Sequence, residues 1–264
     1  MHANFIDPFH ARDSLLHHVD PRVKLVLAVA FILTTALLPP AAWPGYILVF
    51  ALILAVAIAS ALGPFFAIKR AFLVLPFVLA ALPVLFTTPG EPWLHVPLGR
   101  WALTITAAGL ARFASIALKS WLSMQAGILL AASTPFPQLL MAMRALRVPR
   151  LLVGVFGLMW RYLFVLADEA LRLMRAREAR SAALAGAGGS SVLWRAKVTG
   201  YMAGSLFLRG YERSERIYDA MLARGYDGEV RTLPLPPMAR SDKAALLVGL
   251  AIVGSILALE IWVG

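Results

Sequence analysis

The chain has 264 residues, of which 60% are hydrophobic and 15% charged, and its formal net charge is +11. Soluble domains carry about a quarter charged residues, so the composition argues against a soluble protein and for one whose surplus apolar side chains face lipid. Because the chain contains no cysteine, disulfides, thiolate metal sites and a cysteine nucleophile are excluded.

Four apolar stretches fill the first half of the chain and predict four membrane-spanning helices, each of which needs about 20 residues. Asp20 and Pro21 are typical of a helix start just before the first stretch. Pro76 and Pro83 predict a kink or a break within the third. The stretches are Val23–Leu38, Trp43–Leu62, Ala71–Phe86 and Trp101–Ala132.

Basic residues are distributed unevenly between these stretches, and this predicts the orientation of the chain. The N-terminal segment and the second connection are basic, whereas the first connection (PPAAWPG) has no lysine or arginine. Since basic residues collect on the cytoplasmic side, we expect a cytoplasmic N-terminus. A positive charge of this origin calls for a membrane and an acidic partner, and we expect no nucleic acid partner.

The segment Thr134–Lys243 differs in character, with 17 basic and 9 acidic residues, and is predicted to be cytoplasmic. A fifth apolar stretch, Ala244–Val263, is long enough to span. The sequence thus predicts an all-α integral membrane protein with about five transmembrane helices and a cytoplasmic insert. Its predicted divisions are 1–133 for the N-terminal tail and four spans, 134–243 for the insert and 244–264 for the final span.

Leu151–Ala167 does not fit this scheme easily. It is nearly long enough to cross the membrane, but crossing would export the arginines that follow it, and Arg161 lies near its middle. We interpret it as the apolar start of a long cytoplasmic helix, with a true crossing as the alternative.

About three helices are expected in the insert: Pro137–Arg147, Leu151–Ala183 and Val192–Ala223. A Gly/Ser-rich hinge (AGAGGSS, 185–191) separates the last two. Gly225 follows the third helix and is typical of a left-handed C-terminal cap.

The ends of the second and third helices repeat at an offset of 44: DEALRLMRAREARS (168–181) aligns with ERSERIYDAMLARG (212–225). A small residue on each side of the arginine lets the helix end enter a narrow groove, where the guanidinium can pair with a carboxylate. The alternative is two amphipathic helices that happen to end alike, with arginines stabilising the C-terminal dipole. The residues concerned are Ala179, Arg180, Ser181, Ala223, Arg224 and Gly225.

Nearly the whole chain resembles the transmembrane T component of energy-coupling factor (ECF) transporters, in the cobalt-type, CbiQ-like branch. The resemblance is carried by SLLHHVDPRVKL (14–25), TPFPQLLMAMRALRVP (134–149) and the paired ARS (179–181) and ARG (223–225). It implies a non-catalytic scaffold whose arginine-bearing helix ends dock on two ABC-type ATPase subunits. ATP would bind on those partners, and no cofactor is expected on this chain. Ser181 departs from the glycine of the second motif but is also small.

The resemblance also implies the remaining partners, the location and the substrate. The substrate would bind to a separate small membrane subunit, the S component, with an accessory membrane subunit as a further candidate partner. The location would be the bacterial cytoplasmic (inner) membrane, in which the chain crosses the lipid bilayer several times. Cobalt is the substrate expected from the branch, with nickel or a vitamin as alternatives.

Other residues invite weaker hypotheses. Four histidines (His2, His10, His17 and His18) lie in the first 18 residues, but without an orderly ligand spacing, so we expect no metal site here. Arg112 and Lys119 lie within the fourth stretch, where charges often mark an ion pathway but equally face a partner or an interface.

No catalytic residue is predicted. The sequence has no GxxxxGK[ST] loop and no HExxH or GxSxG motif. A membrane enzyme that holds an anionic substrate with its arginines is one rival interpretation. A secondary transporter is another, but it would show two related halves with broken helices.

Overall fold

The computed structural model describes residues 8–40, 42–90, 92–98, 101–180, 192–230 and 236–263. The chain is predominantly helical, as predicted, and its contacts divide it into two units. The membrane unit comprises Pro8–Ala142 and Leu235–Gly264, and the insert unit comprises Met143–Pro234.

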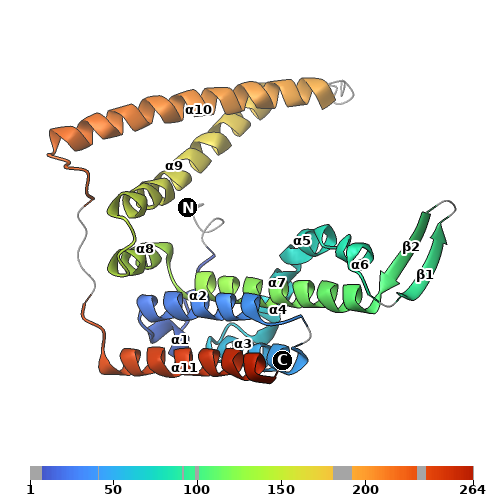
Figure 1. Cartoon of the computed structure of the whole chain (residues 1–264). Coiled ribbons are helices and arrows are strands. Elements are labelled where there is room, and N and C mark those ends of the chain that lie inside the picture. The colour runs from blue at the N-terminus through green and yellow to red at the C-terminus, as the bar shows by residue number, and fades with distance from the viewer. Residues whose placement is uncertain are drawn as a thin grey trace. The chain divides into compact units, whose positions relative to one another are not determined.

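Four helices form the main body of the membrane unit (Figure 1). They are α2 (Pro21–Leu37), α3 (Trp43–Ala59), α7 (Ala107–Ser133) and α11 (Arg240–Val263). Both α2 and α3 pack against α7 and α11. Short α1 (Leu15–His18) precedes this group, and α8 (Phe136–Ala145) follows α7. The first, second and fifth predicted spans are therefore helices that start at or near the expected residues.

A shared apolar core holds these helices together. Phe50 of α3 stacks on Trp121 of α7 with ring centroids 5.8 Å apart. Gly249 allows α11 to approach α2 closely, because a Cβ there would lie 2.6 Å from a methyl carbon of Leu27. Small residues at such contacts are typical of packed membrane helices. The buried core includes Phe31, Leu38, Tyr46, Val49, Ile53, Leu122, Ala126, Leu129, Ala132 and Ile256.

The third apolar stretch is broken, as its prolines predicted. After α4 (Pro64–Ala71), the stretch consists of the 3₁₀ turn η2 (Phe72–Val74), α5 (Leu75–Ala80) and α6 (Val84–Thr87). Pro76 lies in the first turn of α5 and Pro83 directly precedes α6. Proline lacks an N–H and cannot continue the hydrogen-bond ladder of the preceding helix, so the chain restarts a helix at each of these points.

The prediction for the fourth stretch was wrong at its start. Trp101–Thr106 is not helical: it forms strand β2, which pairs antiparallel with β1 (Pro92–Leu98). Helix α7 begins only at Ala107, where the Thr106 side chain accepts a hydrogen bond from the N–H of Gly109 at 3.0 Å. An apolar run of this kind reads equally as strand or helix, and the threonine cap marks the true boundary.

Length and composition make three of the described helices candidates to cross a membrane, namely Ala107–Ser133, Arg150–Arg180 and Arg240–Trp262, with Trp43–Ala59 as a shorter apolar helix. The second of these contains Leu151–Ala167, so both interpretations of that segment stand. Together the helices indicate a chain that crosses the membrane several times.

The insert unit is dominated by two long helices, α9 (Arg150–Arg180) and α10 (Val192–Ala223). The bounds of α10 are those predicted, whereas residues 181–183 of the predicted second helix lie outside the described residues. Neither helix contains a buried residue. Amphipathic helices of this length are normally stabilised when their apolar face packs against another part of the protein. The contacts between α9 and α10 do not bury that face.

Candidate coupling site

Arg224 lies at a well-defined helix end. The N–H of Tyr226 donates to Met221 O at 3.0 Å and the N–H of Gly225 donates to Leu222 O at 2.9 Å, which is the Schellman pattern. Gly225 has φ +78°, a left-handed conformation that glycine adopts without a steric penalty. The predicted glycine cap is confirmed, and it ends the helix so that Ala223 and Arg224 are both exposed.

Arg180 aligns with Arg224 in the repeat and is the last residue of α9 that the structure describes. Ala179 and Arg180 are exposed, whereas Ser181 lies outside the described residues. An exposed guanidinium at a helix end is free to form a bidentate pair with a carboxylate from another molecule. Both arginines predicted to contact a partner are thus accessible, and nothing within the described chain competes for them.

The two helix ends are far apart. Leu166 lies beside Gly210, and Arg177 donates to Thr199 at 3.5 Å, so α9 and α10 run antiparallel (Figure 1). Arg180 therefore lies near the start of α10, while Arg224 lies at the other end of the helix pair. Helices rise roughly 1.5 Å per residue, which puts the two arginines on the order of 40 Å apart. They cannot bind one small ligand together, but they can contact two separate partner surfaces.

Glu169 joins the two helices where they meet. Its carboxylate accepts from Arg209 of α10 at 2.8 Å and from Arg172 of its own helix at 2.5 Å. The hydrogen bond from Arg209 is the main cause that lowers the pKa of the Glu169 carboxyl, and the hydrogen bond from Arg172 is the second cause. The carboxylate therefore links one turn of α9 to one turn of α10.

A basic groove of about 780 Å³ runs between α9 and α10. Its walls carry Arg172, Arg177, Arg180 and Arg209, together with the aromatic rings of Trp194 and Tyr201. Glu169 is its single acidic residue and already pairs with two arginines. The groove that leads to Arg180 therefore favours an acidic partner surface.

The apolar face of α10 is exposed. The sequence places Phe207, Tyr211, Tyr218 and Leu222 on one face, and their exposed fractions are 71%, 56%, 54% and 48%. Contiguous exposed apolar surface of this kind marks a site that another molecule covers. The insert unit thus combines two free arginines with an uncovered apolar helix face.

A second acidic residue ties the chain after α10 to the start of α9. Glu229 accepts from Arg144 through Oε1 and from Arg150 through Oε2, the latter at 2.7 Å. Arg144 also donates to the backbone oxygen of Val230 at 3.0 Å. The sequence pattern did not indicate this cluster, because Glu229 lies 85 residues from Arg144 and 79 residues from Arg150 in the chain.

The DPRVKL element lies in the membrane unit, where it connects helix ends. Asp20 caps α2 by accepting from the N–H of Arg22 at 2.8 Å, and the Arg22 side chain donates to Pro236 O at 3.0 Å. Lys24 is buried and donates to His17 O at 3.2 Å and Ser133 O at 3.3 Å. The element therefore binds the start of α2 to the end of α7 and to the segment before α11.

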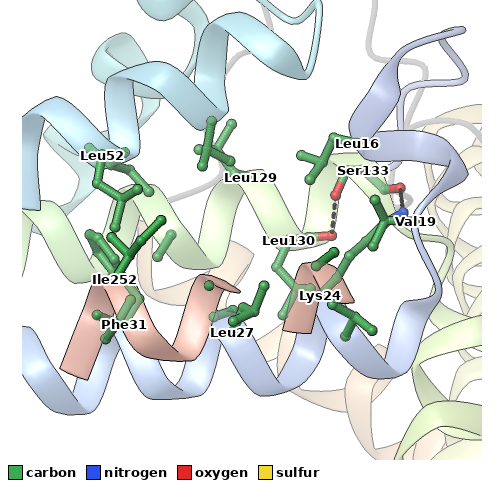
Figure 2. Close-up of a pocket in the computed structure, with 18 residues that line it drawn as sticks. Leu16, Val19, Lys24, Leu27, Phe31, Leu52, Leu129, Leu130, Ser133 and Ile252 are labelled. Carbon is green, nitrogen blue, oxygen red and sulfur yellow. Dashed lines mark hydrogen bonds between the residues drawn. The ribbon is translucent and has the colours of Figure 1, made fainter. Parts of the chain in front are cut away.

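A cavity of about 220 Å³ lies between α2, α3, α7 and α11, and Figure 2 shows its lining. Most of the lining side chains are apolar, such as Phe31, Leu52 and Ile252. Lys24 and Ser133 are the polar residues of the lining and lie at one end of the cavity. The residues that surround the cavity include no carboxylate and no imidazole, which are the side chains that bind cations. The cavity is thus an apolar packing feature and does not suit a metal ion.

The charged residues of α7 differ from one another. Lys119 donates to the carbonyl oxygens of Ala36 at 3.0 Å and Leu38 at 2.6 Å, at the C-terminal end of α2. A lysine that caps a helix end in this way satisfies carbonyls which have no partner within the helix. Arg112 is exposed near the start of α7. Lys119 therefore has a structural contact of its own, whichever role Arg112 plays.

The N-terminal histidines have ordinary polar contacts. His17 bonds to Ser14 Oγ at 2.6 Å and His18 pairs with Asp13 at 2.6 Å, and His2 lies outside the described residues. In the part of the chain that the structure describes, no group of three or more His, Cys, Asp or Glu residues is arranged to hold a metal ion.

Residues 12–234 match the family of cobalt transport proteins, CbiQ. The chain belongs to this family. It is 28% identical to the cobalt transport protein CbiQ of Rhodobacter capsulatus over 82% of each chain. It is 27% identical to CbiQ of Salmonella typhimurium, over 80% of this chain and 92% of that one. It is also 28% identical to the energy-coupling factor transporter transmembrane protein EcfT of Listeria innocua over 93% of each chain.

The matches confirm the interpretation of the sequence as a transmembrane T component of an ECF importer. They span both the membrane unit and the insert unit, so the features described above belong to one transport scaffold. A transport subunit of this family is non-catalytic, in agreement with the absence of catalytic motifs from the sequence.

Proposed function

We propose that this T component couples ATP hydrolysis on two ABC-type ATPase subunits to import through a separate S component. The observation that carries the proposal is the pair of free arginines at the ends of α9 and α10, on helices with no buried residue. Two equivalent ends on the order of 40 Å apart suit two equivalent partners. A single small substrate would need a convergent site instead.

The physical steps follow from the helix ends. Ala179 and Ala223 leave room beside each arginine, so a partner groove can close around the helix end and exclude water. A guanidinium–carboxylate pair gains strength when it is desolvated, and its fork fixes the orientation of the helix end. When the ATPase subunits close around ATP, each helix end then moves with its partner. ATP stays on the partner subunits, and the chain itself needs no cofactor.

We infer that the chain lies in the bacterial cytoplasmic membrane with its N-terminus and the insert unit in the cytoplasm. The support is the distribution of basic residues along the sequence. Since the chain has no cysteine, single cysteines introduced at Ser190 and Gly264 give a clean test. They should label from opposite sides of the membrane, and labelling of both from one side would contradict this topology.

Cobalt is the proposed substrate, because the family and the two CbiQ relatives bear its name, with nickel as the near alternative. A vitamin importer is the further alternative that the sequence resemblance implies. Among the described residues no group of His, Cys, Asp or Glu is arranged to hold a metal ion, so we expect the S component that co-purifies with the chain to select the substrate. Uptake assays on that complex, with cobalt, nickel and vitamins compared, identify the substrate class.

The coupling role is tested by the double variant Arg180→Ala/Arg224→Ala. We expect the variant chain to fold and to reach the membrane but to lose the ATPase subunits in a pull-down, or to uncouple hydrolysis from uptake. A matched control is Arg175→Ala/Arg216→Ala, which removes the same charge at two exposed positions within α9 and α10. Normal ATP-dependent uptake by the Arg180/Arg224 double variant would rule out this function for the two arginines.

A further inference from the structure

The segment after α10 is anchored by one carboxylate that binds two arginines. Glu229 lies four residues beyond Gly225, the cap of α10, and its Oε2 accepts from Arg150 at 2.7 Å. Its Oε1 accepts from Arg144, which also donates to Val230 O at 3.0 Å. Each oxygen of the carboxylate thus has its own arginine, and a backbone hydrogen bond holds the neighbouring residue.

The two arginines lie on either side of a tight turn between α8 and α9. Arg147 in this turn has φ +63°, and the N–H of Val148 donates to Met143 O at 3.1 Å, which closes the end of α8 in a Schellman pattern. A left-handed conformation is costly for a residue other than glycine, so it persists only where its surroundings hold it. Glu229 supports the turn, because it binds Arg144 on one side of the turn and Arg150 on the other.

The anchor reaches the membrane unit through the chain itself. Arg144 lies in the last turn of α8, and only two residues separate the end of α7 from the start of α8. A displacement of the α10 end can therefore pass through Glu229 to α8 and from there to α7. Arg180 has no comparable tie, since no described residue bonds to its side chain. Its route to the membrane unit is α9 itself.

We propose that Glu229 is a positioning residue for energy coupling, which makes movement of the Arg224 end reach the α8–α9 turn. This inference rests on the proposed function of Arg224. Exposed ion pairs add little to folding stability, and the Arg150 side chain is 72% exposed, whereas those of Arg144 and Glu229 are 30% and 26% exposed. Neutralising Glu229 should therefore cost some stability through its contact with Arg144, and thermal melting of the variant measures this loss separately from coupling.

Glu229→Gln is the main variant, because it keeps the size of the side chain and removes the charge. In the whole complex we expect normal co-purification of the ATPase subunits, continued ATP hydrolysis, and a fall of several-fold in the substrate imported per ATP hydrolysed. Glu215→Gln is the matched control: it makes the same charge change at an exposed position on α10 without a partner among the described residues. It should leave this ratio unchanged.

A covalent tie distinguishes positioning from a purely structural contact. The chain has no native cysteine, so Arg150→Cys/Glu229→Cys can be linked with a short bifunctional thiol reagent. The unlinked variant should have a low import ratio, and linking should restore it, because the link replaces the ion pair without its charge.

Two results would overturn the proposal: an unchanged import ratio in Glu229→Gln, or a low ratio that the cross-link does not raise. Failure of the proposed function is a different outcome, since the ATPase subunits would then be missing from the complex of the unmodified chain.

Discussion

The membrane unit and the insert unit are stabilised in different ways. In the membrane unit, α2, α3, α7 and α11 share a buried apolar core, and the buried or half-buried lysines Lys24 and Lys119 donate to carbonyl oxygens at helix ends. In the insert unit, α9 and α10 bury no residue, and their contacts include the ion pair between Glu169 and Arg209. The first unit has a packed core, whereas the second presents exposed apolar and basic surfaces.

This difference predicts where substitutions act. Changes within the membrane unit should lower the stability of the chain. Changes at the ends of α9 and α10 should lower the affinity for partners while the chain remains folded.

The largest effect is expected at Arg180 and Arg224. Loss of one member of a desolvated, bidentate arginine–carboxylate pair typically costs about 2–5 kcal/mol of binding free energy, much of it from the acid that is left unpaired. Arg180→Ala or Arg224→Ala alone should weaken ATPase binding and uptake, since the other helix end still holds one subunit. Binding curves for the purified subunits measure this loss.

Lysine variants at the same positions sharpen this prediction. Arg224→Lys keeps the charge but cannot form the two-pronged contact, so it should recover little of the lost affinity. Thermal melting of the isolated chain should be unchanged for all these variants. Full recovery by lysine would show that only the charge matters at these helix ends.

The second prediction concerns the core of the membrane unit. Gly249→Leu should destabilise the chain by about 1–3 kcal/mol through overpacking, because a Cβ at this position would lie 2.6 Å from Leu27 Cδ2. Gly254→Leu is the matched control on the same helix, since a Cβ there has no neighbour within 4 Å. Melting of the purified chains in detergent compares the two. Equal melting temperatures would contradict the close packing of α11 on α2.

Several features of both units could be predicted from the sequence alone, because they depend on local signals. The bounds of α10 follow from its periodicity and from the glycine after it, and the breaks in the third stretch follow from Pro76 and Pro83. The start of the fourth stretch was missed, since an apolar run does not distinguish strand from helix. Thr106 is the residue that separates the hairpin from α7.

The ion pairs that organise the insert unit could not be predicted in the same way. Glu229 lies about 80 residues from Arg144 and Arg150, and Glu169 lies 40 residues from Arg209. No periodic pattern relates residues at such separations. The repeat at offset 44 indicated two similar helix ends, but their antiparallel arrangement and wide separation come only from the three-dimensional structure.

The third prediction separates the cap of α10 from the fit of its end into a partner groove. Gly225→Ala should destabilise the folded helix end by about 1–2 kcal/mol, because φ +78° is unfavourable for a residue with a Cβ. Gly225→Asn should cost less, since asparagine tolerates this conformation. Space within the chain is not limiting, as a Cβ at Gly225 would have no neighbour within 4 Å.

The measurement is ATPase binding by the two Gly225 variants, with helix-end hydrogen exchange as a second readout. If the cap dominates, Gly225→Asn should bind better than Gly225→Ala. If the narrow groove dominates, the larger asparagine should bind worse although its helix end is intact. Equal binding of both variants to that of the unmodified chain would leave Gly225 without a role at the interface.

The smallest effect is expected for the N-terminal histidines, which belong to the membrane unit as far as they are described. His17 has two local contacts, with Ser14 Oγ at 2.6 Å and His10 O at 3.1 Å. These bonds fold the segment before α2 on itself and leave the ring nitrogens of His17 occupied. Such a ring supports the local structure and is poorly placed to bind a metal ion.

Replacing His2, His10, His17 and His18 with glutamine should therefore leave cobalt or nickel uptake largely intact, with at most a small drop in the melting temperature from the lost His17 contacts. Glutamine retains a hydrogen-bonding side chain but is a poor ligand for late first-row metals, so the variant tests metal binding more directly than alanine would. The KM for metal uptake by the assembled complex is the decisive quantity, because a structural loss lowers the amount of complex without changing that constant. A raised KM in a complex of normal composition would assign the metal a site on this tail, and would extend the role of the membrane unit beyond that of a scaffold.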